Sequence, residues 1–205
     1  MRMQTTNHIP ALRDVVLVGG GHSHVQVLKA FAMRPEPGVR LTLICRDLQT
    51  PYSGMLPGCV SGEYSADDIH IKLAPLCRYA SARLIHDEVS GLDLDARRVL
   101  FEKRPELRYD IVSLNTGAVP RPPPADAVTV KPISSFLPKW RQISERIHAQ
   151  QRLVVVGGGA GGIELSLAAR KALPQGVVLQ LVGESLLPGH NAGAVTKAAA
   201  ALSAF

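Results

Sequence analysis

The sequence has few aromatic residues, few cysteines, and no long run of positive charge or of apolar side chains. Aromatic residues make up 4% of its 205 positions, which is little for a protein that stacks nucleic-acid bases on aromatic rings. The formal net charge is +6, but the 23 lysines and arginines are scattered and never form a run of five or six. The composition therefore disfavours nucleic acid as a partner, while a basic surface suits a protein that binds anionic dinucleotides.

The three cysteines, Cys45, Cys59 and Cys77, are too far apart for a C-x-x-C motif and have no histidines at zinc-binding spacing. We therefore expect no metal site and a reducing cytoplasmic location. Residues 1–14 contain no apolar stretch of signal-peptide length, and no later run approaches the roughly 18 apolar residues of a membrane span. The sequence thus predicts a protein that is neither exported nor membrane-spanning.

A β-α-β pattern opens the chain. Residues 15–18 form a short apolar, β-branched run that stops at three glycines, as in a strand buried on both faces of a parallel sheet. A helix is predicted from about residue 23 to 33, ended by the prolines of "RPEPG", and a second buried strand over 41–44.

The same pattern returns at residue 153. Strands are predicted over 153–156 and 177–182, with a helix over 160–173 between them. The intervening and final segments are predicted as a Gly/Pro/Ser-rich loop (49–64), a short helix (72–80), an antiparallel hairpin (83–103), a buried strand within 109–120, a proline-rich linker (121–124), a helix (134–150) and a helical tail (191–205).

The two β-α-β patterns superpose without a gap when the chain is displaced by 138 positions. Gly19 then meets Gly157, the two strand pairs coincide, and His24 stands where the second copy has Gly162. Self-similarity at so long an offset indicates two related domains rather than solenoid repeats. Because each copy follows an apolar strand and opens a helix, both predict a dinucleotide-binding turn.

The chemistry of this turn tells which positions can vary. The first glycine (Gly19, Gly157) makes the tight turn, and the second (Gly21, Gly159) lets backbone N–H groups approach a pyrophosphate at the helix N-terminus. The third lets the helix pack closely on its strand, so His24 is expected to move the helix without abolishing binding. His22 and His24 are expected to face either phosphate or solvent.

The acidic residue that usually binds the ribose 2′-hydroxyl stands at the end of the second strand, but neither copy has an acid at that position. Its positions hold Cys45 and Gly183, with Asp47 and Glu184 close by. No arginine adjoins Glu184 to favour a 2′-phosphate, so NAD is preferred over NADP. The alternative that neither acid touches ribose stays open.

Two such units, the first with a surface hairpin and the T-G-x-x-P pattern of Thr116, Gly117 and Pro120, resemble the FAD-dependent pyridine nucleotide-disulfide oxidoreductase family. Through "GGGHSHV", "TPYSGMLPG", "VKPI" and "LLPGHNA" the chain is most similar to NADH dehydrogenase-like flavoproteins fused ahead of selenide, water dikinase. The resemblance implies FAD in the first domain and NAD(P)H in the second, with a link to selenide, water dikinase. It also implies hydride transfer to the flavin and then to a small-molecule acceptor such as a quinone.

The family pattern further implies roles for single residues. Gly54, Met55 and Leu56 would lie on the flavin side, Val89 near the adenine, and Thr116 and Gly117 along FAD. Glu164 would sit where nicotinamide meets flavin, as the catalytic candidate; alternatively, it suits the dipole of a first helical turn. Only Cys59 stands in the loop where disulfide reductases carry a cysteine pair, so disulfide reduction is disfavoured and Cys59 is interpreted as a packed thiol.

The prediction is therefore an α/β chain of two Rossmann-like, three-layer dinucleotide-binding units, the first with an antiparallel β insertion and the second truncated. The expected domains are an incomplete FAD-binding domain (1–120), a linker and helix (121–150), and the first part of an NAD(P)-binding domain (151–205). Such a fragment is expected to be inactive alone and, through unpaired sheet edges, to dimerise. The cofactor-binding candidates are Gly19, Gly21, His22, Ser23, His24, Cys45, Arg46, Asp47, Gly54, Met55, Leu56, Val89, Thr116, Gly117, Gly157, Gly159, Gly162 and Glu184.

Two other functions remain open at this point. The first is a non-redox module that binds one adenine nucleotide in the first domain. The second is a conventional dehydrogenase with a single nicotinamide site, which the duplicated turn disfavours.

Overall fold

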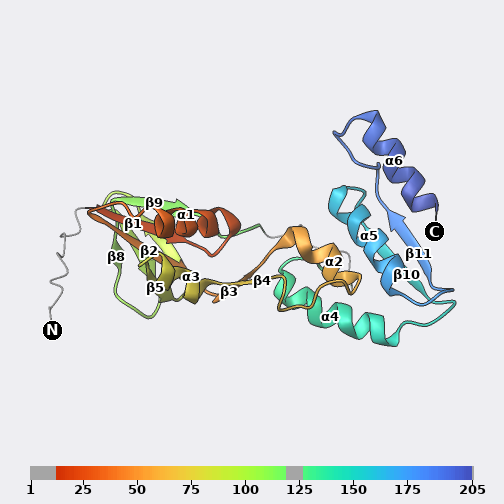
Figure 1. Ribbon diagram of the computed structural model, residues 1–205, viewed down its shortest axis with the longest axis horizontal. Coiled ribbons are helices and arrows are strands. Elements are labelled where there is room, and N and C mark those ends of the chain that lie inside the picture. The colour runs from red at the N-terminus through yellow and green to blue at the C-terminus, as the bar shows by residue number, and fades with distance from the viewer. Residues whose placement is uncertain (1–12, 119–126, 205) are drawn as a thin grey trace. The chain divides into compact units, whose positions relative to one another are not determined.

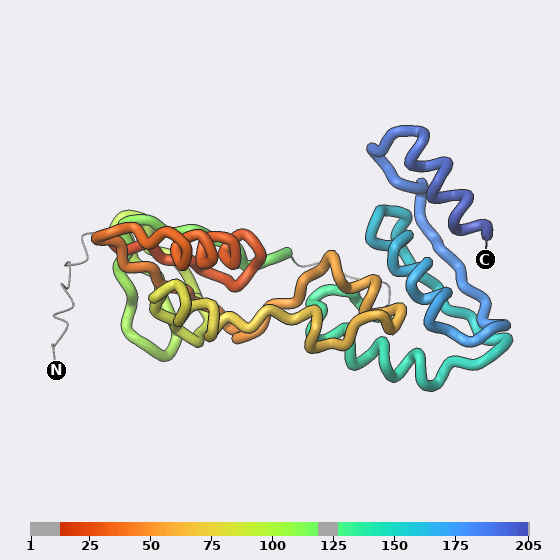
Figure 2. Tube along the Cα trace, in the orientation of Figure 1, coloured from red at the N-terminus to blue at the C-terminus, as the bar shows by residue number. Residues whose placement is uncertain are grey.

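The computed structural model describes residues 13–118 and 127–204, so Pro120 and the predicted linker 121–124 lie outside the described residues. The chain divides into two compact units, and each is built from two separate stretches of sequence. Of the described residues, 13–50 and 71–118 form the first unit, and 51–70 and 127–204 form the second. The colour change along the tube in Figure 2 lets the reader follow these stretches.

The first unit begins with the predicted β-α-β pattern. Strand β1 (Arg13–Val18) leads into helix α1 (His22–Met33), which is followed by β2 (Val39–Cys45). The two strands pair in parallel, with Val15 opposite Leu41 and Val18 opposite Ile44. The unbroken apolar run of residues 15–18 in β1 and the buried run of residues 41–45 in β2 fit a sheet that is covered on both faces.

The sheet of this unit lies in the middle of three layers. Its strands run parallel in the order β5-β2-β1-β9, with β5 at Arg83–His86 and β9 at Ile111–Leu114. Helix α1 and helix α3 (Leu73–Tyr79) cover one face (Figure 1). An antiparallel sheet covers the other face through its own core cluster, and its strands are β6 (Val89–Asp93), β7 (Arg98–Phe101) and β8 (Leu107–Arg108).

The segment predicted as one hairpin, residues 83–103, is divided between two sheets. Residues 83–86 form β5 and pair in parallel with β2, where Ile85 is buried. The antiparallel sheet starts only at Val89 and gains a third strand at Leu107. Alternation of apolar and polar residues marks a strand but does not tell which sheet it joins, and this explains the error.

The predicted loop 49–64 also contains regular structure. Strand β3 (Gln49–Pro51) pairs with β4 (His70–Lys72), and the chain passes through them out of the first unit and back into it. Between them lie a 3-10 turn (Ser53–Met55) and helix α2 (Leu56–Val60). Leu56 and Val60 are buried in the core of the second unit, so tertiary packing stabilises a helix in a Gly/Pro-rich stretch.

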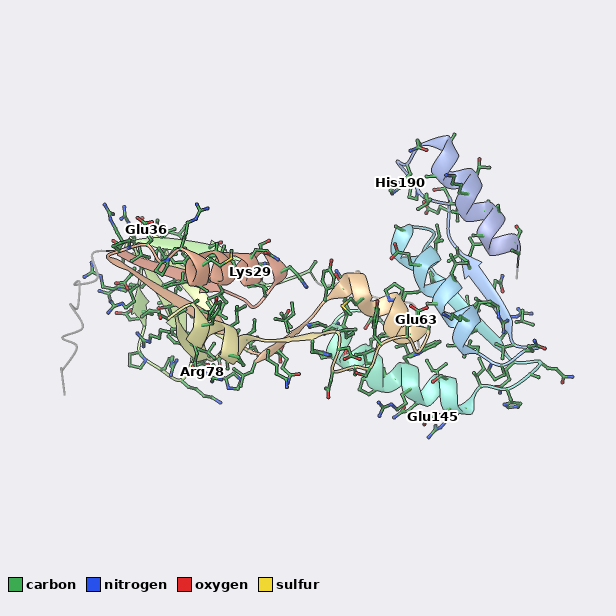
Figure 3. The ribbon with its side chains drawn as sticks, in the orientation of Figure 1. Lys29, Glu36, Glu63, Arg78, Glu145 and His190 are labelled. Atoms are coloured by element: carbon green, nitrogen blue, oxygen red, sulfur yellow. The ribbon has the colours of Figure 1, made fainter. Side chains whose placement is uncertain are left out.

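The second unit repeats the β-α-β pattern. Strands β10 (Arg152–Val156) and β11 (Val178–Val182) pair in parallel around α5 (Ala160–Ala172), while α4 (Ile133–Arg146) precedes them and α6 (Ala192–Ser203) follows. Helices α2, α4 and α5 share one apolar cluster with the inner face of the sheet. Glu63, labelled in Figure 3, adds an exposed ion pair to Lys171 of α5 at 2.5 Å.

The outer face of this sheet carries Val154, Val156, Val178 and Val182, each between 43% and 62% exposed. Among the described residues of the second unit, no layer covers that face. The prediction of three layers thus holds for the first unit, whereas the described part of the second has its helices on the inner face alone.

The offset of 138 positions holds in three dimensions. Leu153 opposes Leu179, as Val15 opposes Leu41, and Val156 opposes Val182, as Val18 opposes Ile44. The two strand pairs therefore have the same register as well as similar sequences.

The compact units group the chain differently from the predicted domains. Residues 51–70 pack in the second unit rather than with the rest of 1–120, because Leu56, Val60 and Ile69 are buried there. Helix α4, predicted as part of a linker region, contributes Ile133 and Phe136 to the same core. Which cofactor each stretch binds stays a prediction.

Candidate dinucleotide-binding turns

The first glycine turn joins β1 to α1. Gly19 has a φ of +94°, a conformation that residues with a side chain rarely adopt, and its N–H donates to Ile44 O at 2.8 Å. Gly21 is the N-cap of α1, and its carbonyl accepts the N–H groups of His24 and Val25. The N–H groups that precede His24 therefore lie at the positive end of the helix, as in an anion-binding terminus.

The second turn repeats this geometry. Gly157 has a φ of +123° and donates its N–H to Val182 O at 2.7 Å, and Gly159 is the N-cap of α5. A Cβ added to Gly159 or to Gly161 would meet nothing within 4 Å. The face of this turn at the helix start is open, so it has room for a diphosphate.

The third-glycine position separates the two turns. A Cβ added to Gly162 would lie 1.8 Å from Gly157 O, so α5 starts in direct contact with its turn. At the equivalent position His24 carries a whole side chain, and α1 must start farther from the turn carbonyl. His24 is 1% exposed, so the expectation that it faces phosphate or solvent is not met.

Asn115, which sequence reasoning missed, lies against the first turn. A Cβ on Gly19 would be 2.1 Å from its carbonyl oxygen, and a Cβ on Gly21 would be 2.4 Å from its carboxamide. Asn115 also donates its N–H to Val18 O at 2.8 Å. The signal in the sequence was its place at the end of β9, directly before the Thr116–Gly117 pattern.

The end of β2 carries three candidates for ribose contact. Cys45 is 4% exposed and packs in the core, so its side chain is not available to a ligand. Arg46 and Asp47 are exposed and form an ion pair at 3.1 Å, with Glu88 3.8 Å from the same guanidinium. Both hydrogen bonds from Arg46 end on Oδ2 of Asp47.

The end of β11 explains why Gly183 stands where an acid was expected. A Cβ on Gly183 would lie 2.6 Å from Gly158 N, so any side chain there would collide with the turn. The following loop is held to the same glycine, because Leu187 N–H donates to Gly158 O at 2.8 Å. Glu184, the next residue, is exposed.

Three further candidates lie on helices α1 and α5. His22 and Ser23 are the first two residues of α1, and Ser23 is exposed. Glu164 is exposed on α5, but it is the fifth residue of that helix rather than part of its first turn. The alternative that it only complements the helix dipole is therefore weakened, because that effect decays beyond the first turn.

The other predicted contacts are spread over both units. Val89 is half-buried in the antiparallel layer, and Thr116 and Gly117 are exposed after β9. Gly54 and Met55 lie in the second unit in the 3-10 turn, next to Leu56. Leu56 is 4% exposed in the core of that unit, so its side chain is not open to a flavin.

The three cysteines have thiols whose pKa is raised by burial. Burial raises the pKa of Cys45 and Cys59, and burial together with the neighbouring Cys45 raises the pKa of Cys77 to about 11. A thiol with a raised pKa is a poor nucleophile at neutral pH. This fits the interpretation of Cys59 as a packed thiol.

Within residues 13–118 and 127–204, no cluster of three or more His, Cys, Asp or Glu side chains could hold a metal ion. Over the same residues, no helix is both long enough and apolar enough to span a bilayer.

Residues 13–203 match the family described as pyridine nucleotide-disulphide oxidoreductase, and the chain belongs to that family. Among curated relatives, it is 29% identical over 158 residues to a nitric oxide reductase FlRd-NAD(+) reductase of Salmonella arizonae, covering 76% of this chain and 41% of the relative. It is 27% identical over 168 residues to putidaredoxin reductase of Pseudomonas putida, covering 78% of this chain and 39% of the relative. The chain thus spans about two fifths of the length of these curated relatives.

Solved structures share the fold. Putidaredoxin reductase, in its covalent complex with putidaredoxin, matches with a TM-score of 0.71 at 24% identity, over 94% of this chain and 49% of that one. The sulfide:quinone oxidoreductase of Aquifex aeolicus matches with a TM-score of 0.69 at 20% identity, again over 94% and 49%. The predicted α/β, Rossmann-like class is thereby confirmed.

Proposed function

We propose that this chain is the part of a flavin-dependent oxidoreductase that holds FAD at the Gly19–Gly21 turn and NAD(P)H at the Gly157–Gly159 turn. The observation that carries the proposal is the duplicated turn, with the same strand register, positive-φ glycine and helix start at an offset of 138 residues. Membership of the family supports it. FAD, when bound, would accept hydride from NAD(P)H and pass electrons to an acceptor.

Each turn would hold its diphosphate through backbone amides at a helix start. In the second turn, the open space around Gly159 and Gly161 fits such a group. At the end of β2, Oδ1 of Asp47 is the oxygen that a ribose hydroxyl could reach, since Arg46 uses Oδ2. Glu184 would take the same role in the second turn, which favours NADH over NADPH.

Charge substitutions at equivalent positions test the assignment of each cofactor. Ser23→Asp and Gly161→Asp both place a carboxylate at a helix start, where it favours the helix but repels a diphosphate. We expect the first to weaken FAD binding at least tenfold and the second to weaken NADH binding by the same factor, each measured by fluorescence titration. Ser23→Asn and Gly161→Asn are the matched neutral controls and should bind nearly as the unmodified chain does.

Three results would contradict the proposal. One is a chain that binds neither FAD nor NADH, and another is an exchange of the two sensitivities. The third is binding of AMP or ADP as tightly as FAD, which would favour the non-redox module instead. Mass spectrometry of small molecules released on denaturation of the purified protein gives an independent reading.

Glu164 is proposed as the residue at the contact between nicotinamide and flavin, supported by its exposed position on α5 and by the family pattern. In the complete protein, Glu164→Gln should lower the rate of flavin reduction by NADH while leaving the Kd for NADH within about threefold. Stopped-flow absorbance of the flavin measures both. An unchanged rate would remove Glu164 from the reaction.

The acceptor is proposed to be a quinone or a small redox protein. The curated relatives include a putidaredoxin reductase and a nitric oxide reductase FlRd-NAD(+) reductase, which supports a small redox protein, and the resemblance of the sequence supports a quinone. NADH oxidation by the complete protein, measured with each acceptor class in turn, distinguishes them. No oxidation with either would contradict this choice.

Two further proposals come from the sequence. A cytoplasmic location is proposed from the three widely spaced cysteines, and a link to selenide, water dikinase is proposed from the motifs quoted above. Co-purification of that enzyme with the tagged chain, against the Ser23→Asp variant as bait control, tests the link. A homodimer is proposed because β10 and β11 are the two strands of their sheet in the described residues, which leaves its outer edges open to pair with another chain. Light scattering tests it, and a monomer at micromolar concentration would refute it.

A further inference from the structure

His24 uses both of its ring nitrogens inside the first unit. Nδ1 lies 2.7 Å from Gly19 O, and Nε2 lies 2.9 Å from Ser113 Oγ on β9. The side chain is 1% exposed, between the start of α1 and the sheet. It thus connects the glycine turn, the helix and the edge strand β9.

The partners determine which nitrogen carries the proton. A backbone carbonyl can only accept a hydrogen bond, so Nδ1 must donate to Gly19 O. Burial lowers the pKa of His24 below its ordinary value of 6.5, so that at pH 7 the neutral ring has Nε2 as an acceptor for the Ser113 hydroxyl. The histidine is thereby fixed as the Nδ1–H tautomer, with Ser113 holding the ring in place.

The Gly19 peptide is held from three sides by these contacts. Its N–H donates to Ile44 O on β2, its carbonyl accepts from His24 on α1, and the preceding Val18 O accepts from Asn115 N–H after β9. In the second turn the equivalent carbonyl, Gly157 O, is covered by the backbone of Gly162 instead. The first turn therefore replaces a close helix approach with a side-chain hydrogen bond.

We propose that His24 is a positioning residue: its Nδ1–H, backed by Ser113, holds the Gly19–Gly21 turn in the conformation that presents its amides to the dinucleotide. The part about the dinucleotide rests on the proposed function. The part about the turn depends only on the two hydrogen bonds.

The substitutions separate the donor from the bulk of the ring. His24→Asn keeps an amide N–H near the place of Nδ1–H, whereas His24→Leu keeps apolar volume but has no donor. Ser113→Ala removes only the group behind the ring, and His148→Asn, on an exposed histidine of the second unit, is the matched control. FAD affinity is measured by quenching of flavin fluorescence in the 205-residue chain.

We expect FAD binding to weaken at least tenfold in His24→Leu, two- to fivefold in Ser113→Ala, less than threefold in His24→Asn, and not at all in His148→Asn. A merely space-filling role predicts the reverse order for Leu and Asn. Equal affinity in His24→Leu and in the unmodified chain would overturn the proposal. If His24→Leu does not fold, Ser113→Ala decides: an FAD affinity equal to that of the unmodified chain would then overturn the proposal.

NMR of the cofactor-free chain keeps the two proposals apart. Nitrogen-15 shifts of the His24 ring should report the Nδ1–H tautomer, and the amide signals of Gly20 and Gly21 should move more in Ser113→Ala than in His148→Asn. An Nε2–H tautomer would overturn the role of His24 whatever FAD does. A chain with the expected tautomer and amide shifts but no FAD binding would refute the proposed function alone.

Discussion

In the first turn, Asn115, Leu73 and His24 occupy the space around all three glycines, whereas in the second turn Gly157 and Gly159 face open space and Gly158 alone is crowded, by Ser185 O. Strand register and glycine conformation are nevertheless the same in both turns. Because the neighbours differ while the backbone does not, the glycines themselves determine the backbone path of such a turn. Its rigidity depends on elements that arrive from elsewhere in the chain, here β9 and α3.

The largest expected difference is between Gly19→Ala and Gly157→Ala. Both put a side chain at a positive φ, which costs about 1–2 kcal/mol, but only the first also drives Cβ to within 2.1 Å of Asn115 O. We expect Gly19→Ala to destabilise the first unit by about 3 kcal/mol or more, and Gly157→Ala to destabilise the second by about 1–2 kcal/mol. Hydrogen exchange of the β1 and β10 amides measures the stability of each unit separately. An equal loss of stability in the two variants would contradict this prediction.

The third-glycine position gives the next effect. Gly162→Ala places Cβ 1.8 Å from Gly157 O, so α5 has to shift, at a cost of about 1–3 kcal/mol. The control is Gly161→Ala, where Cβ meets nothing and alanine favours the helix. Thermal unfolding followed by circular dichroism should show a lower transition for the first variant only. If the Gly162→Ala protein is as stable as the unmodified chain, the start of α5 can move away from Gly157 O without a cost in stability, and the prediction is wrong.

Thiol reactivity compares the cores of the two units. Cys45 and Cys77 of the first unit are 4% and 1% exposed, while Cys59 of the second is partly exposed. Because buried thiols react only when the structure opens, we expect iodoacetamide at pH 8 to label Cys59 at least tenfold faster than the other two. Peptide mass spectrometry over time measures this, with the denatured chain as the control. Faster labelling of Cys77 would contradict the buried core of the first unit.

The smallest effect is a dependence of stability on pH. The folded state lowers the pKa of His24 below 6.5, so below that pH the unfolded chain binds more protons than the folded one. Stability of the first unit should therefore fall as the pH drops below about 6.5, until the folded-state pKa is reached. Urea unfolding at pH 7.5 and 5.5 measures the slope, which should be reduced in His24→Asn. If stability depends on pH equally in His24→Asn and in the unmodified chain, groups other than His24 cause the dependence.

Much of this architecture is predictable because it is local in sequence. The apolar runs at 15–18 and 153–156, each followed by glycines and a helical period, indicate both β-α-β patterns and their offset. The pairing of β5 with β2 is not local, so alternation in 83–103 gave the wrong sheet. Helix α2 depends on partners in α4 and α5 and has no signal of its own.

The candidate site shows the same limit. The glycines were identifiable, because only their backbone conformation matters. Asn115 and Ser113 act through contacts with residues about 90 positions away, and such contacts leave no periodic pattern. From the sequence, Gly183 stands at a position where an acidic residue is expected. In the structure, Gly158 N lies so close that no side chain fits there.

The excursion of residues 51–70 out of the first unit has a consequence for synthesis on the ribosome. Leu56, Val60 and Ile69 emerge early, but the residues that bury them, such as Ala169 and Leu173, are translated about a hundred codons later. At about 5–20 residues per second, this apolar segment waits roughly 5–20 s for its partners. During that interval the apolar side chains of residues 51–70 stay exposed on the nascent chain. We therefore expect a chaperone at the exit tunnel to bind this segment.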